Sequence, residues 1–282
     1  MQNHRILLII FLFASSIFAQ IETPQPSPFA KMSQMVGITE LSIEYSRPGI
    51  KGREIFGGLV PFGEVWRTGA NASTKFKFSS DVMLEGNKIP AGEYSLYTMP
   101  REREWKIIIN NILDSGGNYK AEGDVVSFNV KPQIMPLAVE RFTIEIADVT
   151  DNSAHIILKW AQTKVPIKLE VDTDALVMKS IAQFIEKDDP KDAGGWYNAA
   201  RYYFENNKSK EEALDMVNRS LEIDDQPFWV LRLKSQLLAQ TGDFEEAIIF
   251  AKKSMVNAQK AGNDQFVKMN EEAIAEWQGK TE

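Results

Sequence analysis

The stretch LSIEYSRPGIKGR, residues 41–53, decides the fold class. Its first five residues alternate apolar and polar side chains, which is the period of a β-strand with one buried face. The alternation stops at Arg47-Pro48-Gly49, where proline and glycine favour a turn. Short alternating runs separated by glycine or proline recur further along the chain. The sequence therefore predicts an antiparallel β-domain.

Eight alternating runs are predicted strands, a number that is typical of an antiparallel, jelly-roll-like β-sandwich. They are residues 41–45, 74–78, 81–84, 94–98, 105–110, 124–130, 140–146 and 154–160. Residues 166–171 are predicted to add an edge strand, because proline is tolerated at the start of a strand. The predicted sandwich spans residues 34–171.

The apolar spacing lengthens after Asp172 to that of an amphipathic α-helix, which is predicted to end near Asp189-Pro190. Periodic helical patterns continue from there toward the end of the sequence. Residues 172–282 are therefore predicted to form a second, all-α domain.

An internal repeat lies within this second domain. The segment KEEAL at 210–214 recurs as FEEAI at 244–248, and Ser220 recurs as Ser254, both at an offset of 34 residues. This offset is the period of tetratricopeptide repeats, whose helix pairs stack side by side. The sequence predicts two such repeats and a closing helix near 264–277.

The first 19 residues have the pattern of a cleavable signal peptide. A short polar start precedes an unbroken apolar run at 6–13, and Ala19 is the expected last residue before cleavage. The apolar run is too short for a comfortable membrane span, although an uncleaved anchor is the alternative. Residues 20–33 contain three prolines and are predicted to form a flexible tether. We therefore expect a periplasmic or secreted protein without a stable membrane span after cleavage.

The composition excludes several kinds of chemistry. A net charge of −7 without a basic stripe argues against nucleic-acid binding. The absence of cysteine removes thiolate nucleophiles, iron–sulfur clusters and the usual structural zinc sites. The one histidine beyond the expected signal peptide, His155, is interpreted as an ordinary strand residue. The pairs Asp188-Asp189 and Asp224-Asp225 are interpreted as helix caps. No metal site or cofactor is predicted.

Three longer stretches carry a family resemblance: RPGIKGR, IFGGLVPFGEVWRTGAN and PAGEYSLYTMP, the last at 90–100. They resemble the exported bacterial family known as domain of unknown function 2911 (DUF2911), over roughly residues 30–170. The resemblance implies a secreted, β-rich domain of unknown activity, often followed by a helical repeat region. It transfers no catalytic residue, so the chemistry stays open.

The same motif stretches provide the candidate ligand-binding residues. These are Arg47, Lys51, Arg53, Trp66, Arg67 and Asn71. Guanidinium groups offer paired donors to anions, and an indole offers a stacking face for a sugar-like ligand. The architectural interpretation, which we favour because buried aromatic rings and paired arginines are common structural parts, has Trp66 filling the core and the arginines pairing with Glu54 and Glu64 or bonding to backbone carbonyls.

These observations favour an exported binding or scaffold protein over an enzyme. The β-domain would hold a small anionic or sugar-like ligand, and the repeats would contact a protein or peptide. A secreted hydrolase that uses carboxylates near the motif, and an envelope-assembly protein of purely structural role, are the alternatives. A hydrolase predicts two convergent carboxylates in a pocket near Arg67, whereas a binding protein predicts cations and aromatic rings without that pair.

Overall fold

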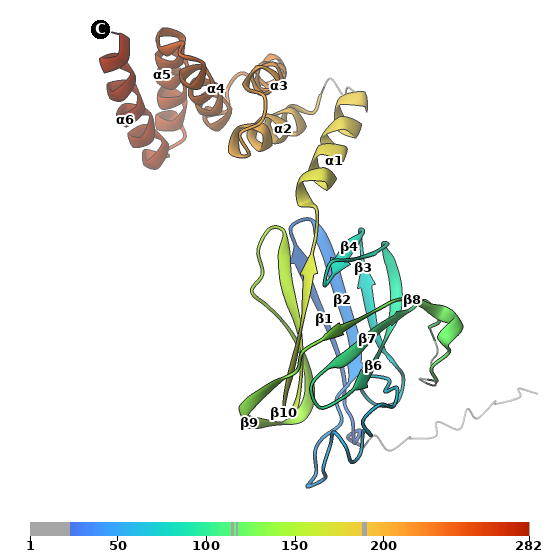
Figure 1. Cartoon of the computed structure of the whole chain (residues 1–282). Coiled ribbons are helices and arrows are strands. Elements are labelled where there is room, and N and C mark those ends of the chain that lie inside the picture. The colour runs from blue at the N-terminus through green and yellow to red at the C-terminus, as the bar shows by residue number, and fades with distance from the viewer. Residues whose placement is uncertain (1–22, 114–115, 117, 188–190, 282) are drawn as a thin grey trace, which may run out of the picture. The chain divides into compact units, whose positions relative to one another are not determined.

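The computed structural model describes residues 23–113, 116, 118–187 and 191–281 (Figure 1). The chain divides into two compact units, and the boundary falls between Thr173 and Asp174. The first unit is built from antiparallel sheets and the second from helices. The expected signal peptide lies outside the described residues. Within the described part, no helix is both long and apolar enough to cross a membrane.

The β unit contains two antiparallel sheets. The larger sheet has the order β1-β2-β3-β6-β7-β8 and the smaller has the order β5-β4-β10-β9. The strands are β1 (Phe29–Val36), β2 (Thr39–Ser46), β3 (Thr74–Phe78), β4 (Val82–Leu84), β5 (Asn87–Ile89), β6 (Gly92–Pro100), β7 (Trp105–Asn110), β8 (Asp124–Val130), β9 (Gln133–Ala147) and β10 (Ser153–Glu170). A short 3₁₀ helix, η1 (Ala121–Gly123), precedes β8.

One hydrophobic core joins the two sheets. On β2, the inward positions Leu41, Ile43 and Tyr45 are buried and alternate with more exposed polar residues. Ile156 and Leu158 of β10 contribute to the same core from the smaller sheet. Removal of these apolar faces from water, at about 25 cal/mol per Å², is the main force that holds the sheets together. The apolar residues of the alternating pattern that predicted the strands are thus the residues that fill the core.

The N-terminal edge of the larger sheet begins earlier than the sequence suggests. Residues 20–33 were expected to form a tether, but β1 starts at Phe29 and pairs antiparallel with β2, from Phe29↔Ser46 to Val36↔Thr39. The outward side of β1 mixes exposed apolar residues, Phe29 and Met35, with polar ones, and Lys31 forms an ion pair with Glu44 across the two strands at 2.8 Å. On the inward side Val36 is fully buried, whereas the residues before it are only half-buried and include the polar Gln34. This weak alternation explains why β1 does not stand out in the sequence.

The strand β10 joins two stretches that the sequence predicts as separate strands. The backbone of Ala161 has a positive φ of 49°, and the pairing of β10 with β9 shifts register on both sides of this residue. The amide of Val171 donates to the carbonyl of Asn152 at 2.9 Å, so the two ends of β10 lie side by side. The strand predicted at 166–171 is therefore the last part of β10, which follows the bend, and not a separate strand.

The described residues of the second unit form six helices, the first of which begins at the boundary residue. They are α1 (Thr173–Lys187), α2 (Ala193–Glu205), α3 (Lys210–Ile223), α4 (Phe228–Thr241), α5 (Phe244–Lys260) and α6 (Asp264–Thr281). Side chains cap the N-termini of α2, α3 and α5, where Asp192, Ser209 and Asp243 each accept a bond from a backbone N–H in the first turn. Asp224 is the C-cap of α3, whereas Asp188 and Asp189 lie outside the described residues.

The residues of the internal repeat occupy equivalent places in two helix pairs. Ala213 and Ala247 are both completely buried. The hydroxyl of Ser220 donates to the carbonyl of Ala193 at 2.8 Å, and that of Ser254 donates to the carbonyl of Phe228 at 2.7 Å. In both pairs the second helix is therefore fastened to the start of the first by the same kind of hydrogen bond.

Two glycines in tight hairpin turns provide a matched test of the β unit. Gly37 lies in the β1–β2 turn with φ of +56°, and Gly86 lies in the β4–β5 turn with φ of +77°. A Cβ on Gly37 would overlap Thr173 Oγ1 and the carbonyl oxygen of Asp151, whereas a Cβ on Gly86 would meet nothing within 4 Å.

We expect Gly86→Ala to lower the free energy of unfolding by about 1 kcal/mol, which is the strain of a left-handed backbone alone. Gly37→Ala adds overpacking and should cost about 2–4 kcal/mol. Urea unfolding of the two variants checks the difference. Equal decreases in the free energy of unfolding would contradict this account, because they would show that the turn at Gly37 can shift to avoid the overlap.

A carboxylate links α1 to the rest of the helical unit. Asp174 Oδ1 accepts from the hydroxyl of Tyr202 and pairs with Lys208 Nζ, both at 2.8 Å. The bonds from Lys208 and Tyr202 hold the pKa of Asp174 below its ordinary value of 3.8. Because the folded pKa is the lower one, the stabilisation is present above the unfolded pKa and is lost as the pH falls through the folded pKa.

Asp174→Asn should therefore lower the melting temperature of the helical circular-dichroism signal at neutral pH by roughly 1–3 °C. The difference from wild type should vanish as the pH falls below the folded pKa of Asp174, where the carboxyl is protonated in both states. Glu271→Gln is the control, because Glu271 is exposed and has no ion pair among the described residues. A pH-independent difference would contradict this account.

Candidate functional site

The motif residues lie in one long connection between β2 and β3, residues 47–73, which we call the motif loop. Near its start, Gly49 forms a β-bridge with Arg141 of β9, and the amide of Ile50 donates to the carbonyl of Glu140 at 2.8 Å. Further along, Trp66 forms a β-bridge with Thr98 of β6. The loop is thus bonded to both sheets, although it contains little regular structure of its own.

Two of the candidate arginines bond to backbone oxygens near the start of the loop. Arg47 Nε donates to the carbonyl of Phe142 at 3.1 Å, and its Nη2 donates to Thr143 Oγ1 at 2.7 Å. Arg53 Nη2 and Nε donate to the carbonyls of Gly49 and Ile50, at 2.6 and 3.0 Å. Arg47 thus bonds the loop to β9, and Arg53 closes the turn at Gly49 and Ile50, positions that suit a multidentate guanidinium. The architectural interpretation describes both residues.

Trp66 belongs to a cluster of aromatic rings between the sheets. Its ring stacks on Trp160 with centroids 5.6 Å apart, and its edge meets Phe142 at 5.2 Å. Phe56 and Trp105 complete the cluster. The indole Nε1 donates to the carbonyl of Gly69 at 3.0 Å. Trp66 therefore anchors the loop in the core and remains half-buried, with part of its surface still accessible.

A buried network of hydroxyl groups holds the end of the loop. Thr68 is completely buried and has a φ of 55°, a strained value for a β-branched residue, and its Oγ1 donates to Thr98 Oγ1 at 3.1 Å. The hydroxyl of Thr74 donates to the carbonyl of Thr68, and the hydroxyls of Ser73 and Ser95 lie 3.0 Å apart. The sequence reasoning missed these residues. The small polar run from Thr68 to Thr74 was the available signal.

A depression of about 310 Å³ opens beside this anchored part of the loop. Glu64, Trp66 and Arg67 line it from the loop, Tyr97 lines it from β6, and Tyr119 lines it from the segment before η1. Arg67 Nη1 donates to the carbonyls of Asn71 and Gly116, at 2.6 and 3.2 Å. Among the described residues that line the depression, Glu64 is the only carboxylate.

Tyr119 is held in its neutral form. Its hydroxyl donates to Asp124 Oδ2 at 2.6 Å, and its ring meets that of Tyr97 edge-on at 5.2 Å. Burial raises the pKa of Tyr119 to about 12, and the bond to Asp124 acts in the same direction. Asp124 Oδ1 also accepts from Asn110 Nδ2 at 2.9 Å. Both oxygens of this neighbouring carboxylate are thus engaged, and Tyr119 is no base near neutral pH.

The structure brings together only part of the predicted set. Trp66 and Arg67 line the depression, and Asn71 adjoins it through the carbonyl that accepts from Arg67. The amide side chain of Asn71 donates instead to Ser46 Oγ at 3.3 Å. Lys51 lies in an exposed turn, where its backbone amide donates to Glu140 Oε1 at 3.1 Å. Lys51, Arg47 and Arg53 are not among the residues that line the depression.

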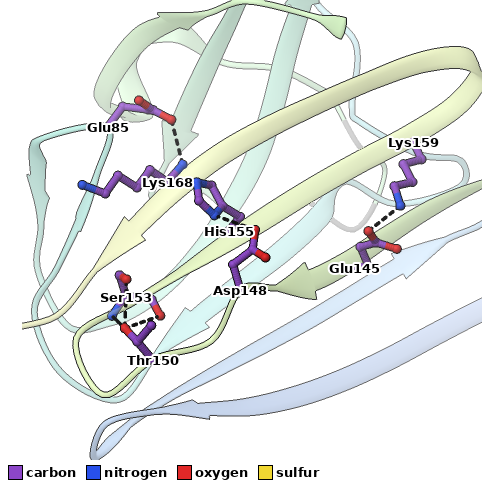
Figure 2. Close-up of polar contacts among 8 residues, drawn as sticks. All are labelled: Glu85, Glu145, Asp148, Thr150, Ser153, His155, Lys159 and Lys168. Atoms are coloured by element: carbon purple, nitrogen blue, oxygen red, sulfur yellow. Dashed lines mark hydrogen bonds and ion pairs between the residues drawn. The ribbon is translucent and has the colours of Figure 1, made fainter. Parts of the chain in front are cut away.

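His155 lies on β10, among polar side chains that face away from the core (Figure 2). Its Nδ1 is 3.2 Å from Asp148 Oδ2 but is not oriented for a hydrogen bond, so the contact is an ion pair only when the ring is protonated. Neighbouring contacts join Glu145 to Lys159 and the amide of Lys168 to Glu85 (Figure 2). No group of three or more His, Cys, Asp or Glu side chains in the described ranges could hold a metal ion.

The helical unit contains a larger concavity of about 800 Å³, which we call the helical groove. Residues of α3, α4 and α5 line it. Its lining combines apolar side chains with lysines, carboxylates and two asparagines. A groove of this size lies in the range of about 300–1,000 Å³ that is typical of ligand pockets.

The fold and the site define a class of protein: an antiparallel, sheet-rich domain with a motif loop fastened to both sheets, followed by a helical unit. The chain belongs to the family described as Protein of unknown function (DUF2911), whose model matches residues 27–169. The match begins just before β1 and ends within β10, so it includes the motif loop and both sheets. No curated protein matches the chain.

The aromatic cluster can be tested on the loop itself. Trp66→Ala removes a ring that touches four others, and we expect it to lower the free energy of unfolding by about 2–4 kcal/mol. Phe62→Ala is the control, because Phe62 lies on the same loop but is 42% exposed, and it should cost less than about 1 kcal/mol. Urea unfolding measures both. Similar losses would show that Trp66 does not anchor the loop.

Proposed function

We propose that this chain is an exported binding protein. Its β unit binds a small anionic or sugar-like ligand in the depression beside the motif loop, and its helical unit contacts a protein partner. One observation carries the proposal for the β unit: the depression combines aromatic rings and a guanidinium with a single carboxylate, Glu64, among the described residues that line it.

This lining favours binding over hydrolysis. Glycoside hydrolases generally place two carboxyl groups across the scissile bond, about 5–5.5 Å or 6.5–9.5 Å apart. Glu64 has no such partner in the lining, and the nearby carboxylate of Asp124 accepts bonds from Tyr119 and Asn110. Tyr119 also remains protonated near neutral pH. An acid–base pair is therefore not available from these residues.

The same groups suit a polyol better than a strong anion. The Nη1 of Arg67 is occupied by two carbonyls, while its Nε and Nη2 have no protein acceptor in the described structure and can donate to a ligand. Glu64 can accept from a hydroxyl group, and its negative charge offsets that of the guanidinium. Trp66 and Tyr119 offer ring surfaces for the apolar face of a sugar. Of the two ligand classes, we therefore favour the sugar-like one.

The proposal includes the finer architecture and the location. We infer that the two sheets form a jelly-roll-like sandwich and that α2 to α5 form two tetratricopeptide-like repeats, which the equivalent bonds of Ser220 and Ser254 support. We also infer cleavage near Ala19 and a periplasmic or secreted protein, which the polar, apolar and small-residue pattern of the first 19 residues supports.

Thermal-shift measurements on residues 20–282 test the ligand site against a panel of neutral and acidic sugars, nucleotides, peptides and divalent ions. A ligand at a hundred times its dissociation constant stabilises the folded state by about 2.7 kcal/mol. We expect at least one sugar to raise the melting temperature. Glu64→Gln should weaken its binding about five- to tenfold, because a charged acceptor is replaced by a neutral amide.

Glu54→Gln is the matched control. Glu54 is an exposed carboxylate on the same loop, but it does not line the depression. The substitution removes the same charge, so it should leave the ligand-induced shift unchanged. Equal effects of the two variants, or no stabilisation by any sugar or anion in the panel, would contradict a ligand site at the depression.

A further inference from the structure

The helical groove has a distinct basic end. Phe250 of α5 lies at this end, with Lys234 Nζ of α4 at 3.9 Å from its ring centroid and Lys253 Nζ of α5 at 4.8 Å. Both distances are within the range of cation–π contacts. The two ammonium groups therefore converge on one aromatic ring from neighbouring helices.

These two lysines lack carboxylate partners within ion-pair distance among the described residues. Burial lowers the pKa of Lys234, and the charge of Lys253 acts in the same direction, although Glu246 opposes it. Two like charges held near one ring, one of them partly withdrawn from water, repel each other. An anionic group placed between them would relieve this repulsion and would gain two charge-assisted hydrogen bonds.

The remainder of the groove suits a peptide backbone. Leu221 and Val256 provide apolar surface. Asn218 also lines the groove, and its Oδ1 is buried without a hydrogen-bond partner. An unsatisfied buried acceptor costs roughly 1–3 kcal/mol, which a donor from a ligand would recover. A backbone N–H is such a donor, and it does not depend on the identity of the side chain.

Carboxylates in the lining oppose a polyanion. Glu222 and Asp225 line the groove together with three lysines, Lys234, Lys252 and Lys253, and the chain as a whole carries −7. A nucleic acid or another uniformly charged polymer would meet repulsion from these carboxylates. A segment with one isolated carboxylate next to apolar side chains meets no such repulsion when that carboxylate lies beside Lys234 and Lys253.

We propose that the helical groove binds an acidic, apolar peptide segment of a partner protein, with a side-chain carboxylate seated between Lys234 and Lys253 beside Phe250 and a backbone N–H donated to Asn218. This inference deepens, and rests on, the proposed role of the helical unit in protein contact. In this binding mode, the specificity for an acidic peptide comes from charge complementarity with the two lysines at the basic end.

Fluorescence anisotropy on residues 20–282 tests the proposal with a labelled octapeptide of alternating aspartate and leucine, blocked at both ends. Two peptides of equal length replace each aspartate with asparagine or with lysine. We expect the aspartate peptide to bind at least tenfold more tightly than the asparagine peptide, and less tightly as salt is raised. Lys253→Gln should weaken its binding about three- to tenfold.

Lys260→Gln is the matched control, because Lys260 is an exposed lysine of the same helix that does not line the groove. It removes the same charge and should leave binding unchanged, which separates a local contact from a change in net charge. Circular dichroism of each variant establishes that the helices are intact. Equal losses in the two variants would overturn the proposed carboxylate position.

The peptide panel also separates this inference from the function on which it rests. If the asparagine or lysine peptide binds as well as the aspartate peptide, the groove binds peptides, but the acidic specificity is overturned. If no peptide binds at millimolar concentration, both the inference and the proposed role of the helical unit in peptide contact are contradicted. A ligand at the β-unit depression is measured separately through Glu64→Gln, so its outcome does not affect this one.

Discussion

The stacking of Trp66 on Trp160 is the contact on which the motif loop depends. A connection from 47 to 73 with little regular structure leaves many backbone groups without strand partners, and each group left unpaired in the interior would cost free energy. The aromatic cluster fixes one point of the loop between the two sheets. Arg53 and the hydroxyl of Thr74 bond to carbonyls of the loop, and Arg47 bonds the loop to the Phe142 carbonyl of β9. The motif loop is thus architectural near both of its ends, which are bonded to the sheets, while Leu59 and Phe62 between them remain exposed to solvent.

Much of the β unit was predictable because its strands alternate cleanly. The run at 41–45 lies within β2 and has the expected inward face, and the predicted strand at 105–110 coincides with β7. The strand β1 could not be predicted with the same ease, because the polar Gln34 lies on its inward side while the apolar Phe29 and Met35 are exposed, so the alternation is broken. The bend in β10 depends on a positive φ at an alanine, for which the local sequence gives no signal. Tertiary pairing decides both features.

The candidate site shows a different limit of sequence reasoning. The six predicted residues were grouped because they lie close together in the chain and share chemistry, yet only Trp66 and Arg67 line the depression. Guanidinium groups on a loop compete for its unpaired carbonyls, and residue type alone does not reveal which of them will be occupied. Tyr97 and Tyr119 enter the site from segments that are distant in sequence, so no spacing within the motif could indicate them. Residue type suggested candidate groups, whereas the fold decides which of them line the depression.

Net charge and local charge have separate consequences in this protein. A chain that carries −7 is disfavoured as a partner for polyanions, yet Lys234 and Lys253 are held near the same aromatic ring without carboxylates of their own. Screening in salt confines the influence of exposed charges to about 8–10 Å, so the surrounding acidity does not cancel a pair of cations in a groove. In the proposed binding mode, this pair attracts the isolated carboxylate of a peptide, while the surrounding acidic surface repels uniformly charged polymers.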